Sequence, residues 1–584
     1  MKTKPLAVFI ALVLFEGIFA AIILLVMPFD SSRGHLLNYQ AIRLGLEILV
    51  VPALFGLGFL LIRFLRNAQF ARAVVSFLDE KMTGKTRRLF FVQGALLVLS
   101  LFLVECSLLT YLAFPVPLRP IFIWAALTCF EAWLGLRLMY SAAYRERPSA
   151  GIVLKTKWRE WLPVQRKTLG FLAVIGLLNF LAFAPLNYLR DKNTHFYVHP
   201  DEDVIYPDVV KVLVWQGSFD ATVHNILDGW QWWYGYPYLP ISAAVLIIPR
   251  LLFGETFGQQ VQLNILLLRQ FISVLPMTLA LLLLVYLVTR FKNTLFSIGM
   301  FIFLLFIPGI VKFNFHFWHP DGLILLLIVL TFYFLESDRL RFRSNFYLAA
   351  VTCALALAIK LWGAYFVLAI AGYLAAGWFR KALTFKKTIL AGLAFLLMMI
   401  ATIAISSPTL LVPYVTRSAL EGWQLQQSAL LQGYSEPDPE GVYRTGLANW
   451  LRYFDLYYMK NSIFYLSVAA VIGGSFWGAR KYMNRIILAW CVPTAFFLIN
   501  FVSMKSNHYM IPLMLPLYGG LFLLPFMGQQ TNGSKVSSSQ PKPVIQKLLW
   551  GVLIVAAGSQ FVFNLANIVT SHAVGINDFI SSLH

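Results

Sequence analysis

The sequence predicts an all-α protein that crosses a lipid bilayer about fifteen times. Of its 584 residues, 59% are hydrophobic and only 12% are charged, and the mean hydropathy is +0.72. Soluble domains carry about twice that share of charged residues, so this composition is typical of a polytopic membrane protein. The segments between the apolar runs are short and basic, which is the second sign of membrane-spanning helices.

The apolar runs are long enough to define individual spans, since a helix needs about 20 residues to cross the hydrocarbon core. The candidate spans are 5–27, 43–63, 89–113, 120–142, 169–187, 264–290, 294–311, 322–335, 346–359, 363–378, 388–407, 461–478, 486–503, 509–527 and 547–566. The first run is long for a signal peptide and lacks a clear cleavage site, so we expect a transmembrane helix there.

The net charge of +21 does not indicate nucleic-acid binding. Lys and Arg fall mostly in short segments such as RFKN, ESDRLRFR and FRKALTFKK, which the positive-inside rule assigns to the cytoplasm. The outer face then receives the loops 188–240, 312–322 and 406–460. Residues 240–253 are short and carry Arg250, so we interpret them as a juxtamembrane or re-entrant helix.

The chain divides into two parts. Residues 1–150 form an accessory block of four transmembrane helices, and residues 165–584 carry every long outer loop. Each accessory helix has one glutamate inside its apolar run: Glu16, Glu47, Glu105 and Glu131. These carboxyls either hold the block together, protonated or paired with Arg43 and Arg137, or line a contact with a partner protein or a lipid headgroup. The four cysteines lie in apolar runs without metal-ligand spacing.

The first outer loop contains the stretch 195-HFYVHPDEDVIYPD-208, in which four carboxylates gather. Asp203 and Asp208 are expected to be solvated surface. The pair Asp201–Glu202 differs because an aromatic-rich segment with Tyr236 follows it. Carboxylates beside aromatic faces are typical of sugar-binding surfaces, although aromatic residues at this depth also form an interface belt.

The second outer loop repeats the theme with His319-Pro320-Asp321 directly before an apolar run. Asp321 either caps the following helix or forms a second acidic element. Lys360 lies at the outer end of two short apolar helices, and Lys505 and His508 occupy a matching outer position. Cations on the outer face oppose the positive-inside bias, so they either snorkel to the interface or bind an anionic ligand.

These motifs resemble the GT-C superfamily of membrane glycosyltransferases. The resemblance covers roughly residues 165–527. It rests on HPDE at 199–202, Tyr236-Pro237 entering a helix, HPD at 319–321 and Lys360. Bacterial relatives of protein O-mannosyltransferases and lipid A aminoarabinose transferases are the most similar in pattern. The resemblance implies a GT-C-like helical bundle with juxtamembrane helices on the outer face, in a bacterial inner membrane.

The same resemblance implies a chemistry. The donor would be a polyprenyl-phosphate-linked sugar in the outer leaflet, the acceptor a lipid, glycan or protein, and the transfer inverting. Asp201 would be the base and Glu202 its partner. The implied substrate-binding residues are Tyr236, Asp321, Lys360, Lys505 and His508. His199 and His319 are candidate ligands of a divalent metal ion, although both precede proline and also suit turns.

Two other classes of protein fit part of the pattern. A transporter or a flippase for lipid-linked sugars also has many helices with buried charges, but it predicts inverted repeats and helices broken in mid-membrane. The sequence shows long outer loops and no visible repeat. A non-catalytic scaffold that kept the fold is the third reading, and the intact Asp201–Glu202 pair argues against it.

Overall fold

The structure is a computed structural model that describes residues 3–27, 39–83, 86–112, 114–140, 161–188, 200–228, 234–432, 444–527 and 543–582. Throughout these residues the regular elements are helices and none is a strand, which confirms the all-α prediction. Eleven helices are long and apolar enough to cross a membrane, so a polytopic membrane protein is also confirmed. The predicted count of about fifteen crossings is not confirmed.

Several predicted spans form shorter helices. Apolar runs near 294, 346 and 461 give α14 (Thr294–Leu305), α16 (Ser344–Ile359) and α21 (Asn461–Phe476), which are below the length of a full crossing. The run 509–527 gives α23 (Ile511–Phe522), in which all twelve side chains are buried. A helix that is apolar all round belongs to a core, and α23 packs against α13, α15, α21 and α22.

The interpretation of residues 240–253 as too short to cross needs correction. The helix α11 (Tyr238–Phe253) begins earlier, after the Tyr236-Pro237 turn, and continues through the 3-10 helix η1 (Gly254–Gln259). Together they form a segment of 22 residues that is among the eleven candidate spans. Hydropathy alone hid this, because the polar residues of η1 end the apolar run at Phe253.

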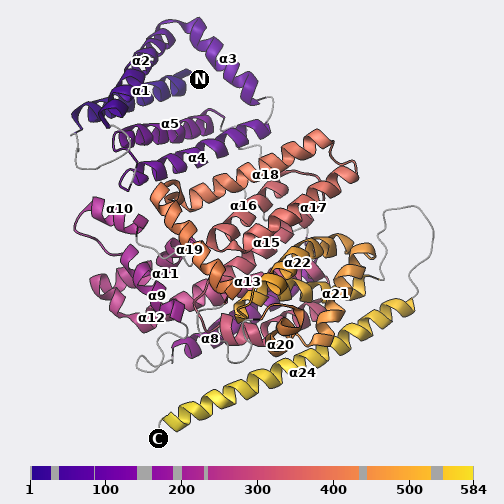
Figure 1. Ribbon diagram of the computed structural model, residues 1–584. Helices are drawn as coiled ribbons and strands as arrows, with labels where there is room; N and C mark the ends of the chain where they lie inside the picture. The colour runs from indigo at the N-terminus through magenta and orange to yellow at the C-terminus, as the bar shows by residue number, and fades with distance from the viewer. Residues whose placement is uncertain are drawn as a thin grey trace. The chain divides into compact units, whose positions relative to one another are not determined.

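The described chain divides into two compact units. The first contains residues 1–160, 215–229 and 408–416. Its elements are α1 (Thr3–Val26), α2 (Tyr39–Arg66), α3 (Ala68–Thr83), α4 (Thr86–Leu109), α5 (Leu118–Met139), α10 (Phe219–Asp228) and η5 (Pro408–Leu411). α1 packs against α2 and α5, and α4 packs against α5 (Figure 1). The predicted boundary between 150 and 165 falls largely on residues 141–160, which lie outside the described residues.

Close helix contacts in the first unit depend on small and polar residues. A Cβ on Gly17 would lie 2.4 Å from Leu54 and 2.7 Å from Trp124, so glycine lets α1 approach both neighbours. The indole of Trp124 donates to the Val13 carbonyl at 2.9 Å. Glu47 pairs with Arg43 at 2.9 Å, as the sequence predicts, and Glu131 shares a hydrogen bond with Glu16 across α5 and α1.

The second unit contains residues 161–214, 230–407 and 417–584. Its further elements are α8 (Pro163–Tyr188), α9 (Pro200–Val212), α12 (Val261–Leu268), η2 (Arg269–Val274), α13 (Leu275–Thr289), η3 (Ile310–Asn314), α15 (Asp321–Asp338), η4 (Leu361–Tyr365), α17 (Phe366–Phe379), α18 (Phe385–Ser406), α19 (Pro413–Gln432, which begins in the first unit), α20 (Leu447–Tyr457), α22 (Lys481–Phe501), η6 (Asn507–Met510), η7 (Leu524–Phe526) and α24 (Pro543–Ser582).

The core of the second unit forms around α13, α15 and α23. α15 packs against α13 and α16, and its buried face includes Leu325, Ile328 and Phe332. The long helix α24 lies along this unit, where Gln560 accepts the Lys460 backbone N–H at 2.9 Å (Figure 1). α15 starts within this core, and its first residue is Asp321.

A first prediction concerns sidedness. In a variant without native cysteines, a cysteine replacing the exposed Thr445 should react with an impermeant maleimide in intact cells. A cysteine replacing the exposed Ser344, the first residue of α16 directly after a basic segment, should not react until the membrane is permeabilised, because basic segments face the cytoplasm. The opposite labelling pattern would invert the predicted topology.

Candidate functional site

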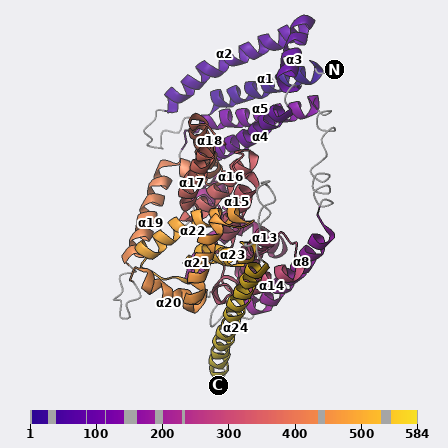
Figure 2. The same ribbon diagram turned by 90° about the vertical axis from the view of Figure 1, so that its right-hand side faces the viewer.

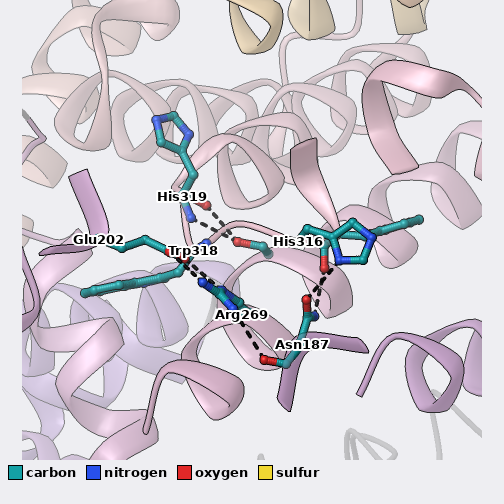
Figure 3. Close-up of polar contacts among 8 residues, drawn as sticks. Asn187, Glu202, Arg269, His316, Trp318 and His319 are labelled. Atoms are coloured by element: carbon teal, nitrogen blue, oxygen red, sulfur yellow. Dashed lines mark hydrogen bonds and ion pairs between the residues drawn. The ribbon is translucent and has the colours of Figure 1, made fainter. Parts of the chain in front are cut away.

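The acidic motifs around Glu202 and Asp321 meet inside the second unit near a buried ion pair. Glu202, in the first turn of α9, and Arg269, the first residue of the π-helical turn η2, are 0% and 1% exposed. The guanidinium donates from Nε to Oε1 at 2.9 Å and from Nη2 to Oε2 at 2.7 Å. Figure 3 shows this two-pronged contact, which gives direction as well as charge compensation.

Backbone and amide groups complete the surroundings of the pair. The Trp318 backbone N–H donates to Glu202 Oε1 at 2.6 Å, and Arg269 Nη1 donates to the Asn187 carbonyl at 3.3 Å. The Asn187 side chain in turn donates to the Phe315 carbonyl at 2.8 Å and contacts His316 Nδ1 at 3.1 Å (Figure 3). Glu202 therefore joins α9 and η2 to the segment before α15, and both of its oxygens already have donors.

Asp201 lies one position earlier on α9 and is half-buried. The Tyr234 hydroxyl donates to its Oδ2 at 2.5 Å. Burial, with the charge of Asp201 and this hydrogen bond, raises the pKa of Tyr234 well above its usual value, so the phenol stays a donor at neutral pH. The Tyr234 ring meets the His319 ring edge to face, with centroids 5.0 Å apart.

Of the two remaining acids of this loop, one is exposed and the other is half-buried. Asp203 is exposed, as expected for surface. Asp208 is half-buried, and burial raises its pKa, with an opposing effect from Lys211.

The turn that carries Tyr234 is fixed to the end of α16. The Gly235 N–H donates to the Ile359 carbonyl at 2.8 Å. A Cβ on Gly235 would lie 1.5 Å from the Ala358 carbonyl oxygen, so only glycine permits this approach. The contact brings Lys360 beside the turn, with its ammonium 5.6 Å from the Tyr234 ring centroid and 5.3 Å from that of Tyr509.

Asp321 lies at the first position of α15, after Pro320 at the N-cap. Its Oδ1 is 3.3 Å from the Lys360 ammonium and its Oδ2 is 2.7 Å from His319 Nδ1. The His319 main chain is held by Ser273, whose hydroxyl accepts its N–H at 3.0 Å. Asp321 therefore has more than a helix-capping environment: it lies between a cation and an imidazole, and it is 3% exposed.

His508 completes a group that has the composition of a metal site. One ligand atom each from His319, Asp321 and His508 lies within 4.8 Å of the others. Two imidazoles and a carboxylate are a donor set that suits Zn²⁺. The His508 Nδ1 lies 2.9 Å from Ser506 Oγ. The residues present therefore fit a divalent metal ion.

The remaining predicted site residues are Lys505, Tyr236 and His199. Lys505 is buried beside the Trp450 ring and donates to the carbonyls of Arg444 and Ser503. These contacts fix the loop before α20. Tyr236 is half-buried in the turn before α11, and its carbonyl accepts the Leu239 N–H at 3.1 Å. His199 lies outside the described residues.

Sequence reasoning missed Arg269, Asn187 and Tyr234. Arg269 had a usable signal, because an arginine inside the apolar run 264–290 is costly in a membrane and marks a partner. Tyr234 was one of many aromatics, and nothing in its spacing distinguishes it. No family model, curated protein or solved structure matches this chain. The relation to GT-C glycosyltransferases therefore stays a prediction from the motifs.

A second prediction follows from the buried pair. Glu202→Gln and Arg269→Gln should each lower the free energy of unfolding by about 3–5 kcal/mol, because each leaves an uncompensated buried charge. The double variant should lose much less than the sum. Glu255→Gln is the matched control, since Glu255 pairs with Arg250 but is 71% exposed, and should change stability by less than about 1 kcal/mol. Thermal and denaturant unfolding measure the stability of all four variants. Losses that add up in the double variant would contradict direct coupling between the two side chains.

Proposed function

We propose that this protein is a membrane glycosyltransferase that moves a sugar from a polyprenyl-phosphate donor to an acceptor on the outer face of the membrane. The observation that carries the proposal is the convergence of Asp201, Asp321 and Lys360 around the Tyr234 ring. Sugar transfer from such a donor needs a base for the acceptor hydroxyl and positive charge for the departing phosphate. Both kinds of group lie here close together. The Tyr234 hydroxyl donates to Asp201, and the Lys360 ammonium lies 5.6 Å from the Tyr234 ring centroid.

Asp201 is the base in this proposal. It is half-buried, and the Tyr234 hydroxyl bond described above orients its carboxylate. Asp201 would take the proton of the acceptor hydroxyl while that oxygen attacks the anomeric carbon. The carbon–oxygen bond to the phosphate breaks, and polyprenyl phosphate leaves with the electron pair. Attack from the side opposite the phosphate inverts the anomeric carbon.

The motif implies that Glu202 is a partner of the base, but in this proposal it positions the base instead. With both oxygens engaged by Arg269 and the Trp318 N–H, it orients α9 and is a positioning residue for Asp201. Lys360 supplies positive charge toward the leaving phosphate, and Asp321 orients Lys360 and His319. A divalent ion held by His319, Asp321 and His508 would add further charge for the phosphate.

A third prediction tests the base. Purified Asp201→Asn protein should transfer sugar from a radiolabelled polyprenyl-phosphate donor about 10²–10⁴ times more slowly than wild type, because the shape is kept and the base is lost. Asp203→Asn, on the same helix but exposed, should keep the wild-type rate. Transfer by Asp201→Asn at the wild-type rate would refute the assignment. Labelled donor that crosses vesicles without transfer would instead support a flippase.

A fourth prediction concerns the metal. Zn²⁺ added to chelator-treated protein should bind with a stoichiometry of one in calorimetry, and His508→Ala should lower its affinity by at least tenfold. Cys353→Ser is the control, because Cys353 is buried away from this group and should leave Zn²⁺ affinity unchanged. Equal affinity in wild type and His508→Ala would exclude this donor set.

A further inference from the structure

A second feature of the same unit lies at the other end of α15. Leu335 and Leu340 lie at the end of this helix, and Leu335 is about 21 Å along the helix axis from Asp321, at 1.5 Å per residue. They form one wall of a groove whose other walls are α17 and α22, two helices that pack together (Figure 2). The groove has a cavity volume of about 90 Å³ and is partly open.

The groove is long and apolar because α17 has small residues along it. Ala369, Gly372 and Ala376 line it at helical spacing, from Phe366 at one end to Arg380 at the other. That length is about 21 Å, which exceeds half of the roughly 30 Å hydrocarbon core. At one end of the lining, the Phe366 ring lies against Trp490 with centroids 4.2 Å apart. The neighbouring surface of α17 is apolar and exposed at Leu368 and Phe379, as expected for a helix that faces lipid.

Two arginines also line the groove, at the end of α17 opposite Phe366 and on α22. Arg380 is exposed and Arg485 is half-buried, with its Nε donating to the Ser475 carbonyl at 2.7 Å. The nearby carboxylates do not neutralise them. Asp338 accepts the N–H groups of Phe342 and Arg343, both at 2.9 Å, and the Tyr373 hydroxyl at 2.8 Å.

The second nearby carboxylate is engaged as well. Glu336 forms ion pairs with Arg290 and Arg480, so two cations already compensate it. The groove therefore combines an apolar lining about 21 Å long with two arginines at one end, and among the described residues neither arginine forms an ion pair with these carboxylates. This end lies beside the basic segments that the positive-inside rule assigns to the cytoplasm.

We infer that this groove binds one anionic glycerophospholipid of the cytoplasmic leaflet. One acyl chain lies between α17 and α22, and the phosphate contacts Arg380 and Arg485. An apolar channel alone would accept any lipid chain, and the arginines select the anionic headgroup, since a basic residue at a membrane surface adds about 1 kcal/mol toward an anionic lipid. This inference is independent of the proposed glycosyltransferase activity.

The test is native mass spectrometry of the purified full-length protein with phosphatidylglycerol and phosphatidylcholine of equal chain length. Wild type should retain one phosphatidylglycerol with at least a fivefold preference over phosphatidylcholine, and Arg380→Gln should lower that preference about fivefold. Lys292→Gln is the matched control, an exposed cation on another basic segment, and should keep the preference.

The channel is tested separately with glycine substitutions. A Cβ on Gly372 meets no atom within 4 Å, so Gly372→Leu fills the groove without disturbing the backbone and should abolish lipid retention. Gly299→Leu, on the exposed face of α14 with the same free space, should retain lipid as wild type does. Thermal unfolding at the wild-type temperature checks that each variant folds.

Three results would overturn the inference. One is equal retention of the two lipids by wild type, and another is unchanged retention by Gly372→Leu. The third is displacement of the lipid by glycerol phosphate alone, which would show a phosphate site without a chain site. A dimer that disappears in Gly372→Leu would instead identify a second copy of the chain as the occupant.

Discussion

The buried ion pair between Glu202 and Arg269 is the interaction on which the geometry of the candidate site depends. Removing two charges from water costs several kcal/mol for each ion, and the Coulomb attraction offsets this only when every remaining donor and acceptor is used. Here the Trp318 N–H and the Asn187 carbonyl complete the set. A displacement of α9 or η2 would separate the two charges and leave each buried without its partner. The pair therefore fixes the first turn of α9 against the segment before α15.

This constraint explains why two adjacent acids have different environments. Successive residues of a helix are turned by about 100°, so Asp201 and Glu202 cannot face the same neighbours. Glu202 faces inward to Arg269, and Asp201 faces the Tyr234 hydroxyl at the edge of the unit. An anchored glutamate next to a half-buried aspartate gives a carboxylate with a fixed direction and partial access. That combination is what a base for an incoming hydroxyl requires.

Much of the fold could be predicted from the sequence, and the site only in part. Composition and apolar runs predict helices and membrane crossings because they depend on local hydropathy alone. The motifs around Asp201, Asp321 and Lys360 were recognisable, and the structure brings these three together. The partners were not, because they arise from contacts between distant segments. Gly235 lies against Ala358 and fixes Lys360 beside Tyr234, while Lys505 bonds to the Arg444 carbonyl. Neither contact has a sequence signal.

The helix α15 carries polar side chains with different environments at its two ends. It carries Asp321 at its start and both Glu336 and Asp338 at its end, with a buried apolar face between them. At its end both acids have partners. Glu336 forms ion pairs with two arginines, and Asp338 accepts hydrogen bonds from backbone N–H groups and from the Tyr373 hydroxyl. At its start Asp321 contacts a lysine and a histidine, Lys360 and His319. The proposed lipid site uses the arginines near one end of α15, and the proposed sugar transfer uses the group around Asp321 at the other. The buried apolar face of α15 packs between these two ends, so one helix positions the residues of both proposals.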